Sequence, residues 1–97
     1  MNEHLKNEYK SNLSDIESLE SDRDILRKAM KNPDDYEFCF EISHKFNSTD
    51  LRSIYINGQK YSIRFAVIME QVIREQIGKI KKANNDIINE IDLKEIG

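Results

Sequence analysis

Apolar residues recur every three or four positions over the first third of the chain. Between residues 3 and 31 they are Leu5, Tyr9, Leu13, Ile16, Leu19, Ile25, Leu26, Ala29 and Met30. This spacing predicts one helix over residues 3–31, because 3.6 residues per turn bring such positions onto one face. The segment Asn32-Pro33-Asp34-Asp35 is expected to end it, since proline disfavours helical backbone in the residue before it.

The pattern then changes to strict alternation. From Tyr36 to Phe46 every second residue is apolar or aromatic, which is typical of a half-buried antiparallel strand. Two further alternating runs, Leu51–Ile56 and Gln59–Ile63, are separated by Asn57-Gly58. An Asn-Gly pair in this position is the strongest short signal for a β-hairpin. We therefore predict a three-stranded antiparallel β-meander over residues 36–63, with Phe38, Phe40, Ile54 and Ile63 on its buried face.

From residue 64 to residue 93 the spacing returns to three and four, which predicts a second helix. The sequence thus predicts an α+β fold of order α-β-β-β-α. Two long antiparallel, coiled-coil-like helices flank the small meander, and residues 1–97 form a single domain. The helices are expected to pack on the sheet through Ile25, Ala29, Phe65, Ile68 and Val72.

Antiparallel pairing of the helices gives a definite register. When paired residue numbers sum to 96, Ile16 meets Ile80 and Asn12 meets Asn84, the one asparagine in each heptad series. A buried asparagine pair costs stability and sets register, so these two are the candidate register-setting residues. The same stripes could instead pair between chains, and both arrangements stay open. Because so thin a sheet buries little surface, we expect a homo-oligomer, a dimer or larger.

Composition and charge exclude several classes of function. Hydrophobic residues are 38% of the 97. The formal net charge is −3, and binding to nucleic acid is not expected because it requires a surplus of Lys and Arg. The polar first ten residues and the lack of a long apolar run predict no signal peptide and no membrane contact, and one cysteine excludes an internal disulfide. A cytoplasmic location is expected. The high use of Ile, Lys and Asn indicates an AT-rich genome.

No constellation of residues indicates catalysis. Cys39 and His44 lie five apart on one expected strand, on opposite faces and about 16 Å apart, which is too far for a nucleophile and its base. With His4 they show no chelating spacing. We therefore expect no enzyme activity, cofactor or metal. The candidate surface for a partner or ligand is an exposed Tyr55 flanked by basic residues, namely Arg52, Lys60 and Arg64.

Three functions remain open. The first is a small non-enzymatic interaction protein that binds and regulates or inhibits another protein, such as a phage- or mobile-element-encoded inhibitor of a host defence protein. The alternative is an oligomer that sequesters a small ligand such as a nucleotide signal. The third function is that of a holdase. It is implied by the order of elements, which resembles that of prefoldin subunits in topology alone.

Overall fold

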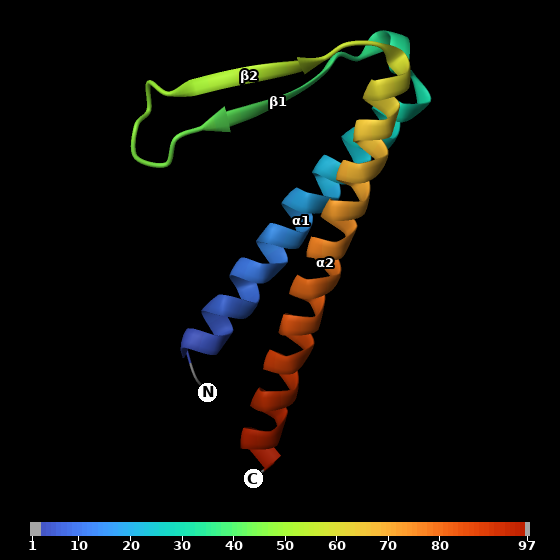
Figure 1. The fold of residues 1–97 in the computed structure, drawn as a ribbon. Helices are drawn as coiled ribbons and strands as arrows, with labels where there is room; N and C mark the ends of the chain where they lie inside the picture. The colour runs from blue at the N-terminus through green and yellow to red at the C-terminus, as the bar shows by residue number, and fades with distance from the viewer. Residues whose placement is uncertain (1–2, 97) are drawn as a thin grey trace.

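Two long helices form an antiparallel helical hairpin in the computed structural model (Figure 1). The structure describes residues 3–96, and side chains are described to residue 91. Helix α1 spans Glu3–Lys31 and helix α2 spans Gln59–Ile96, with a 3₁₀ turn η1 at Pro33–Asp35. Between them lie strands β1, Phe38–Ser43, and β2, Leu51–Ile56. The bounds of α1 confirm the helix predicted over residues 3–31.

The helices are held together along one seam. Its buried centre consists of Ile16, Ile73 and Ile77, with Leu19, Leu26 and Ile80 packed around it. Further along, Asn12 donates a hydrogen bond of 2.8 Å to the side-chain oxygen of Asn84. Asn84 in turn donates to the backbone carbonyl of Tyr9 at 3.3 Å. The structure therefore brings the two asparagines together within one chain, in the register that the heptads predict.

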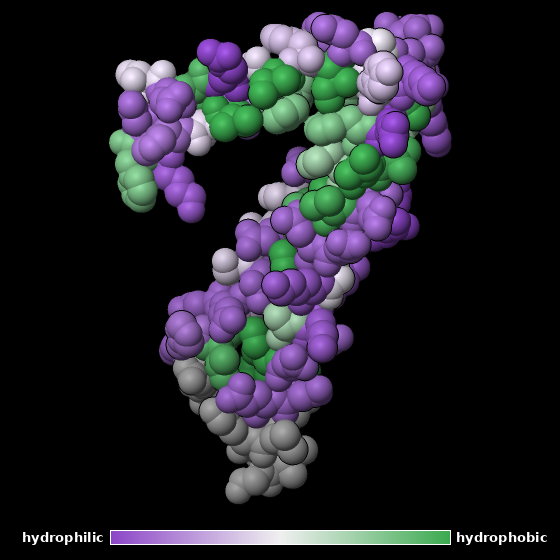
Figure 2. All heavy atoms as spheres, in the orientation of Figure 1, coloured by the Kyte–Doolittle hydropathy of each residue, from purple (hydrophilic) through white to green (hydrophobic). Residues whose placement is uncertain are grey.

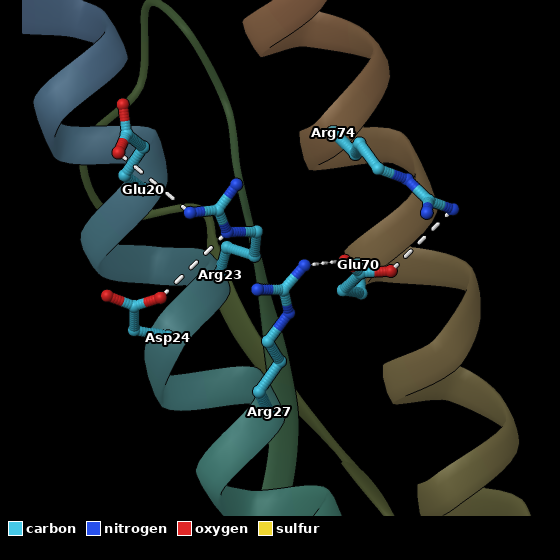
Figure 3. A network of polar contacts seen from close by, with 6 residues as sticks. All are labelled: Glu20, Arg23, Asp24, Arg27, Glu70 and Arg74. Carbon is cyan, nitrogen blue, oxygen red and sulfur yellow. Dashed lines mark hydrogen bonds and ion pairs between the residues drawn. The ribbon is translucent and has the colours of Figure 1, made fainter.

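A layer of charge interrupts the seam near the closed end of the helical hairpin (Figure 3). Arg27 donates to Glu70 across the helices at 2.9 Å, and Arg74 lies 3.8 Å from the same carboxylate. On α1, Arg23 lies 3.8 Å from both Glu20 and Asp24. This layer divides the buried residues into the seam cluster and a second cluster at the closed end.

The second cluster joins the helices to the root of the sheet. Ala29, Phe38 and Ala66 are its buried members. The chain reaches it through a tight turn, in which the backbone and side-chain amides of Asn32 both donate to the carbonyl of Lys28. Pro33 then opens the 3₁₀ turn, where its missing N–H and restricted φ suit the first position.

The sheet has two strands, and the predicted third strand is wrong. β1 pairs with β2 antiparallel from Phe38 opposite Ile56 to Ser43 opposite Leu51. Residues 59–63 form the start of α2 instead, and Ser62 donates a helical bond of 3.0 Å to the carbonyl of Gly58. A type I′ hairpin needs positive φ at both central residues, whereas only Gly58 has it, at 91°. The Asn-Gly pair is therefore a strand-to-helix turn.

Because the third strand is absent, the sheet is a two-stranded β-hairpin that projects from the helices, and we call it the arm. Figure 1 shows it leaving the closed end of the helical hairpin and pointing sideways, at the end opposite both termini. The radius of gyration is 18.3 Å, against about 13 Å for a compact chain of this length. No helix among residues 3–96 is long and apolar enough to cross a membrane.

The predicted packing of helices on sheet is correspondingly incomplete. Phe38 is buried as expected, whereas Phe40 and Ile54 are exposed, although Phe40 stacks on Phe65 with ring centroids 5.8 Å apart. Ile63 is only partly buried. Of the helix residues expected to cover the sheet, Ala29 is buried and three are exposed, namely Ile25, Ile68 and Val72. The arm touches the helices at its root alone, so most of the expected contact is missing.

Candidate interaction surface on the arm

The arm has two faces of different character. Directly opposed residues of antiparallel strands share a face, so the register assigns every side chain. The inner face, turned towards the helices through Phe38 and Phe40, carries Phe38, Phe40, Ile42, Arg52, Ile54 and Ile56. The outer face carries Cys39, Glu41, Ser43, Leu51, Ser53 and Tyr55.

The inner face and the neighbouring helices form an apolar angle. Beside the root of the arm, Ile25 and Phe65 line a hollow of about 200 Å³ together with Phe38. Figure 2 shows apolar side chains along the arm and on the adjoining helices, on the inside of this angle. Six exposed apolar residues line this angle, and we call them the elbow surface: Ile25, Phe40, Ile42, Ile54, Ile68 and Val72. Ile68 and Val72 are included because they follow Phe65 by three and seven positions and so share its face of α2.

The tip of the arm is an ordered loop that exposes an aromatic ring. Phe46 is 92% exposed. Its backbone N–H donates to Nδ1 of His44 at 3.1 Å, and the two rings meet edge to face. Asn47 accepts from both the N–H and the hydroxyl of Thr49, and its carbonyl accepts from the N–H of Asp50. These bonds hold the loop in shape while leaving the Phe46 side chain in solvent.

The outer face exposes two further apolar groups, Leu51 near the tip and Tyr55 near the root, opposite Cys39. Leu51 is 53% exposed and Tyr55 is 55% exposed. We call Phe46, Leu51 and Tyr55 the tip surface, which runs from the loop along the outer face to Tyr55, about 13 Å beyond Leu51. Aromatic residues held in place but uncovered are typical anchors of protein interfaces.

The candidate surface proposed from the sequence is divided among different parts of the molecule. Tyr55 lies on the outer face, whereas Arg52, three positions earlier, lies on the inner face opposite Ile42. Lys60 and Arg64 are exposed on the first turns of α2, one helical turn apart. The grouping assumed a third strand that would carry Lys60 beside Tyr55, and that strand is a helix.

The structure also places the residues considered for chemistry. Cys39 is a free, exposed thiol on the outer face, near the root, while His44 lies at the tip beyond the far end of β1. Among the described residues, no group of three or more His, Cys, Asp or Glu side chains is placed to hold a metal ion. The register-setting candidates Asn12 and Asn84 lie within the seam, remote from the arm.

Sequence reasoning missed Phe46 as a surface residue. It assigned this residue to the apolar face of a strand running from Tyr36 to Phe46, but β1 ends at Ser43. The available signal was the neighbouring Asn47-Ser48-Thr49-Asp50 segment, whose side chains favour turns.

No protein-family model matches this chain, and neither a curated protein nor a solved structure matches it.

Proposed function

We propose that this chain is a non-enzymatic interaction protein that binds another protein through its tip surface and thereby regulates or inhibits it. The observation that carries the proposal is Phe46, 92% exposed at the end of a loop that internal hydrogen bonds keep in shape. Exposing such a ring to water is unfavourable, and ordering the loop costs conformational entropy. A binding role accounts for both.

The geometry of the arm suits insertion into a partner. The loop is ordered before binding, so binding would lose less entropy than it would from a mobile loop. Leu51 lies on the outer face beside the tip, and Tyr55 extends the contact along that face towards the root. Aromatic anchors surrounded by near-neutral contacts are how many protein interfaces obtain their affinity. The partner would offer an apolar pocket for Phe46.

The proposal has a narrower form. The chain is small and acidic, and its high use of Ile, Lys and Asn indicates an AT-rich genome. These features suit a protein encoded by a phage or mobile element. In that setting the partner would be a host protein, such as a component of a defence system, whose active surface the arm would cover.

The test compares three baits in affinity capture from a lysate of the source cells or their host. The wild-type chain is expected to retain one protein in stoichiometric amount, and the variant F46A/Y55A is expected to lose it. The control is Y61A, because Tyr61 is 60% exposed, similar to Tyr55, but lies on α2. Retention by F46A/Y55A, or equal loss with Y61A, would contradict the tip surface as the binding site.

A thermal-shift screen with nucleotides separates this proposal from ligand sequestration. A regulator of a protein is expected to show no change in melting temperature with nucleotides. A rise of several degrees with one nucleotide, lost in R52A or K60A, would favour the sequestering function instead.

A further inference from the structure

The elbow surface is large enough to be one half of a dimer interface. A fully exposed large apolar side chain presents roughly 150–200 Å². The six elbow residues are each between 36% and 55% exposed, so together they present on the order of 500 Å². A standard interface buries about 800 Å² per partner, and in homodimers about two thirds of it is apolar. The two areas agree.

The arm also lacks the support that a small sheet needs. An isolated two-stranded hairpin is marginally stable in water, and independent stability requires more strands or packing against another element. In this chain only the root of the arm has such packing, through Phe38 and the stacked pair Phe40 and Phe65. From Ile42 and Ile54 outward, no side chain among residues 3–91 covers the inner face. A second sheet packed face to face would supply it.

The charges at the two ends of the arm are of opposite sign. The segment that leads into β1 carries three carboxylates, Asp34, Asp35 and Glu37, while the cations of this end, Lys60 and Arg64, lie on α2. The far end carries Arg52 on the inner face and Lys45 in the loop, with Asp50 as the one carboxylate there. If two arms packed in opposite directions, each far end would lie over the acidic root of the other. If they packed in the same direction, like charges would meet.

From these observations we infer that a second copy of this chain covers the elbow surface. The dimer is two-fold symmetric, and the inner faces of the two arms pack against each other in opposite directions. Each arm also lies along Ile68 and Val72 of its partner's helix α2. This inference goes beyond the proposed function and does not depend on it, because it rests on the elbow surface and not on Phe46.

The first test is oligomeric state by sedimentation equilibrium of the full chain. The wild type is expected to be a dimer at about 50 µM, and I42D is expected to raise the dimer dissociation constant by about tenfold or more. The matched control is L51D, because Leu51 is as exposed as Ile42 on the same arm but lies on the outer face. It should leave the dimer intact. Circular dichroism checks that both variants keep their helices.

The second test determines the direction in which the two arms pack. All chains in it carry C39S, which removes the native thiol. Within one chain, position 52 lies opposite Ile42, which is about 20 Å along the extended chain from position 36 on the same face. A bis-maleimide of about 10 Å, the spacing of packed sheets, is expected to link Y36C/R52C chains into a dimer and to leave R52C chains unlinked. A charge reversal gives an independent readout: R52E should weaken the dimer, and R52K should leave it intact.

Several outcomes would overturn the inference. A wild-type chain that remains monomeric at about 50 µM excludes the dimer. A dimer that survives I42D, or that L51D weakens equally, places the interface elsewhere. Efficient linkage of R52C alone shows arms packed in the same direction. Phe46 and Tyr55 are unchanged in all these variants and Leu51 in all but L51D, so partner capture by the tip surface is scored separately with I42D and the position-52 variants.

Discussion

The helical hairpin and the arm differ in how completely each covers its own apolar residues. Along the seam, Ile16, Ile73 and Ile77 are buried by the other helix. On the arm, Phe38 at the root is buried, while Ile42 and Ile54 are exposed. Each helix has a partner of similar apolar pattern and opposite direction, whereas none of the described side chains covers the two-stranded sheet beyond its root. An apolar pattern therefore identifies the face that needs cover, but not what covers it.

The largest expected effect comes from truncating one isoleucine in each region. Ile77 is 4% exposed in the seam, so I77A should lower the free energy of unfolding by about 2–4 kcal/mol through lost burial and the cavity left behind. Ile42 is 55% exposed, so I42A should cost about 0.5 kcal/mol or less in the isolated chain. Urea unfolding followed by circular dichroism measures both.

Protein concentration sharpens this comparison. If a second copy covers the arm, the cost of I42A should grow as the concentration rises, because dimerisation adds to apparent stability by mass action. The cost of I77A should then change little. Equal costs for the two variants in dilute solution would show that the arm is as well packed as the seam, contrary to the structure.

The next effect concerns the polar link within the seam. N84A removes the partner of the Asn12 amide and the donor to the Tyr9 carbonyl, and it should cost about 1–3 kcal/mol because buried polar groups lose their bonds. N12L/N84L removes both amides, so its stability should recover to the wild-type value or above. Its helices should pair in a less unique register. Urea unfolding gives the first result, and the number of backbone amide signals in an NMR spectrum gives the second.

A double variant that is as unstable as N84A would contradict this account. It would mean that the seam cannot close around leucine at these positions, and that the asparagines are retained for shape. In either case the control is N7A, an exposed asparagine on α1 outside the heptad series, which should have almost no effect.

The sequence was sufficient to predict the two helices and their register, but not that they pair within one chain, and the reasons are local. The apolar spacing of α1 and the Asn32-Pro33 stop agree with each other, so the end of the helix at Lys31 was predictable. The heptad series of both helices contain one asparagine each, and matching them gave the register that the Asn12–Asn84 bond shows. Propensity, pattern and capping all favoured one answer here.

The sheet was harder because residues 59–63 satisfy two patterns. Tyr61 and Ile63 alternate as in a strand, yet Ser62 and Ala66 also continue the buried face of α2. Short apolar runs are ambiguous in this way, and long-range packing of Ala66 against Phe38 decides in favour of helix. The candidate surface depended on the third strand, so it failed as a group. The elbow surface exists only because that strand is absent, and it could not be foreseen.

The smallest expected effect tests the joint between arm and helix with two glycines. Gly58 has φ of 91°, and a Cβ there would meet its nearest neighbour, Tyr61, at an ordinary 3.7 Å. G58A should therefore cost about 1–2 kcal/mol from backbone strain alone. Gly78 lies inside α2 with no atom within 4 Å of an added Cβ, so G78A should raise stability by about 0.5–1 kcal/mol. Changes in melting temperature of opposite sign for G58A and G78A would support a left-handed backbone conformation at Gly58. If G58A instead stabilised the chain, the joint would have to be helical there, and the arm would leave the helices at another angle.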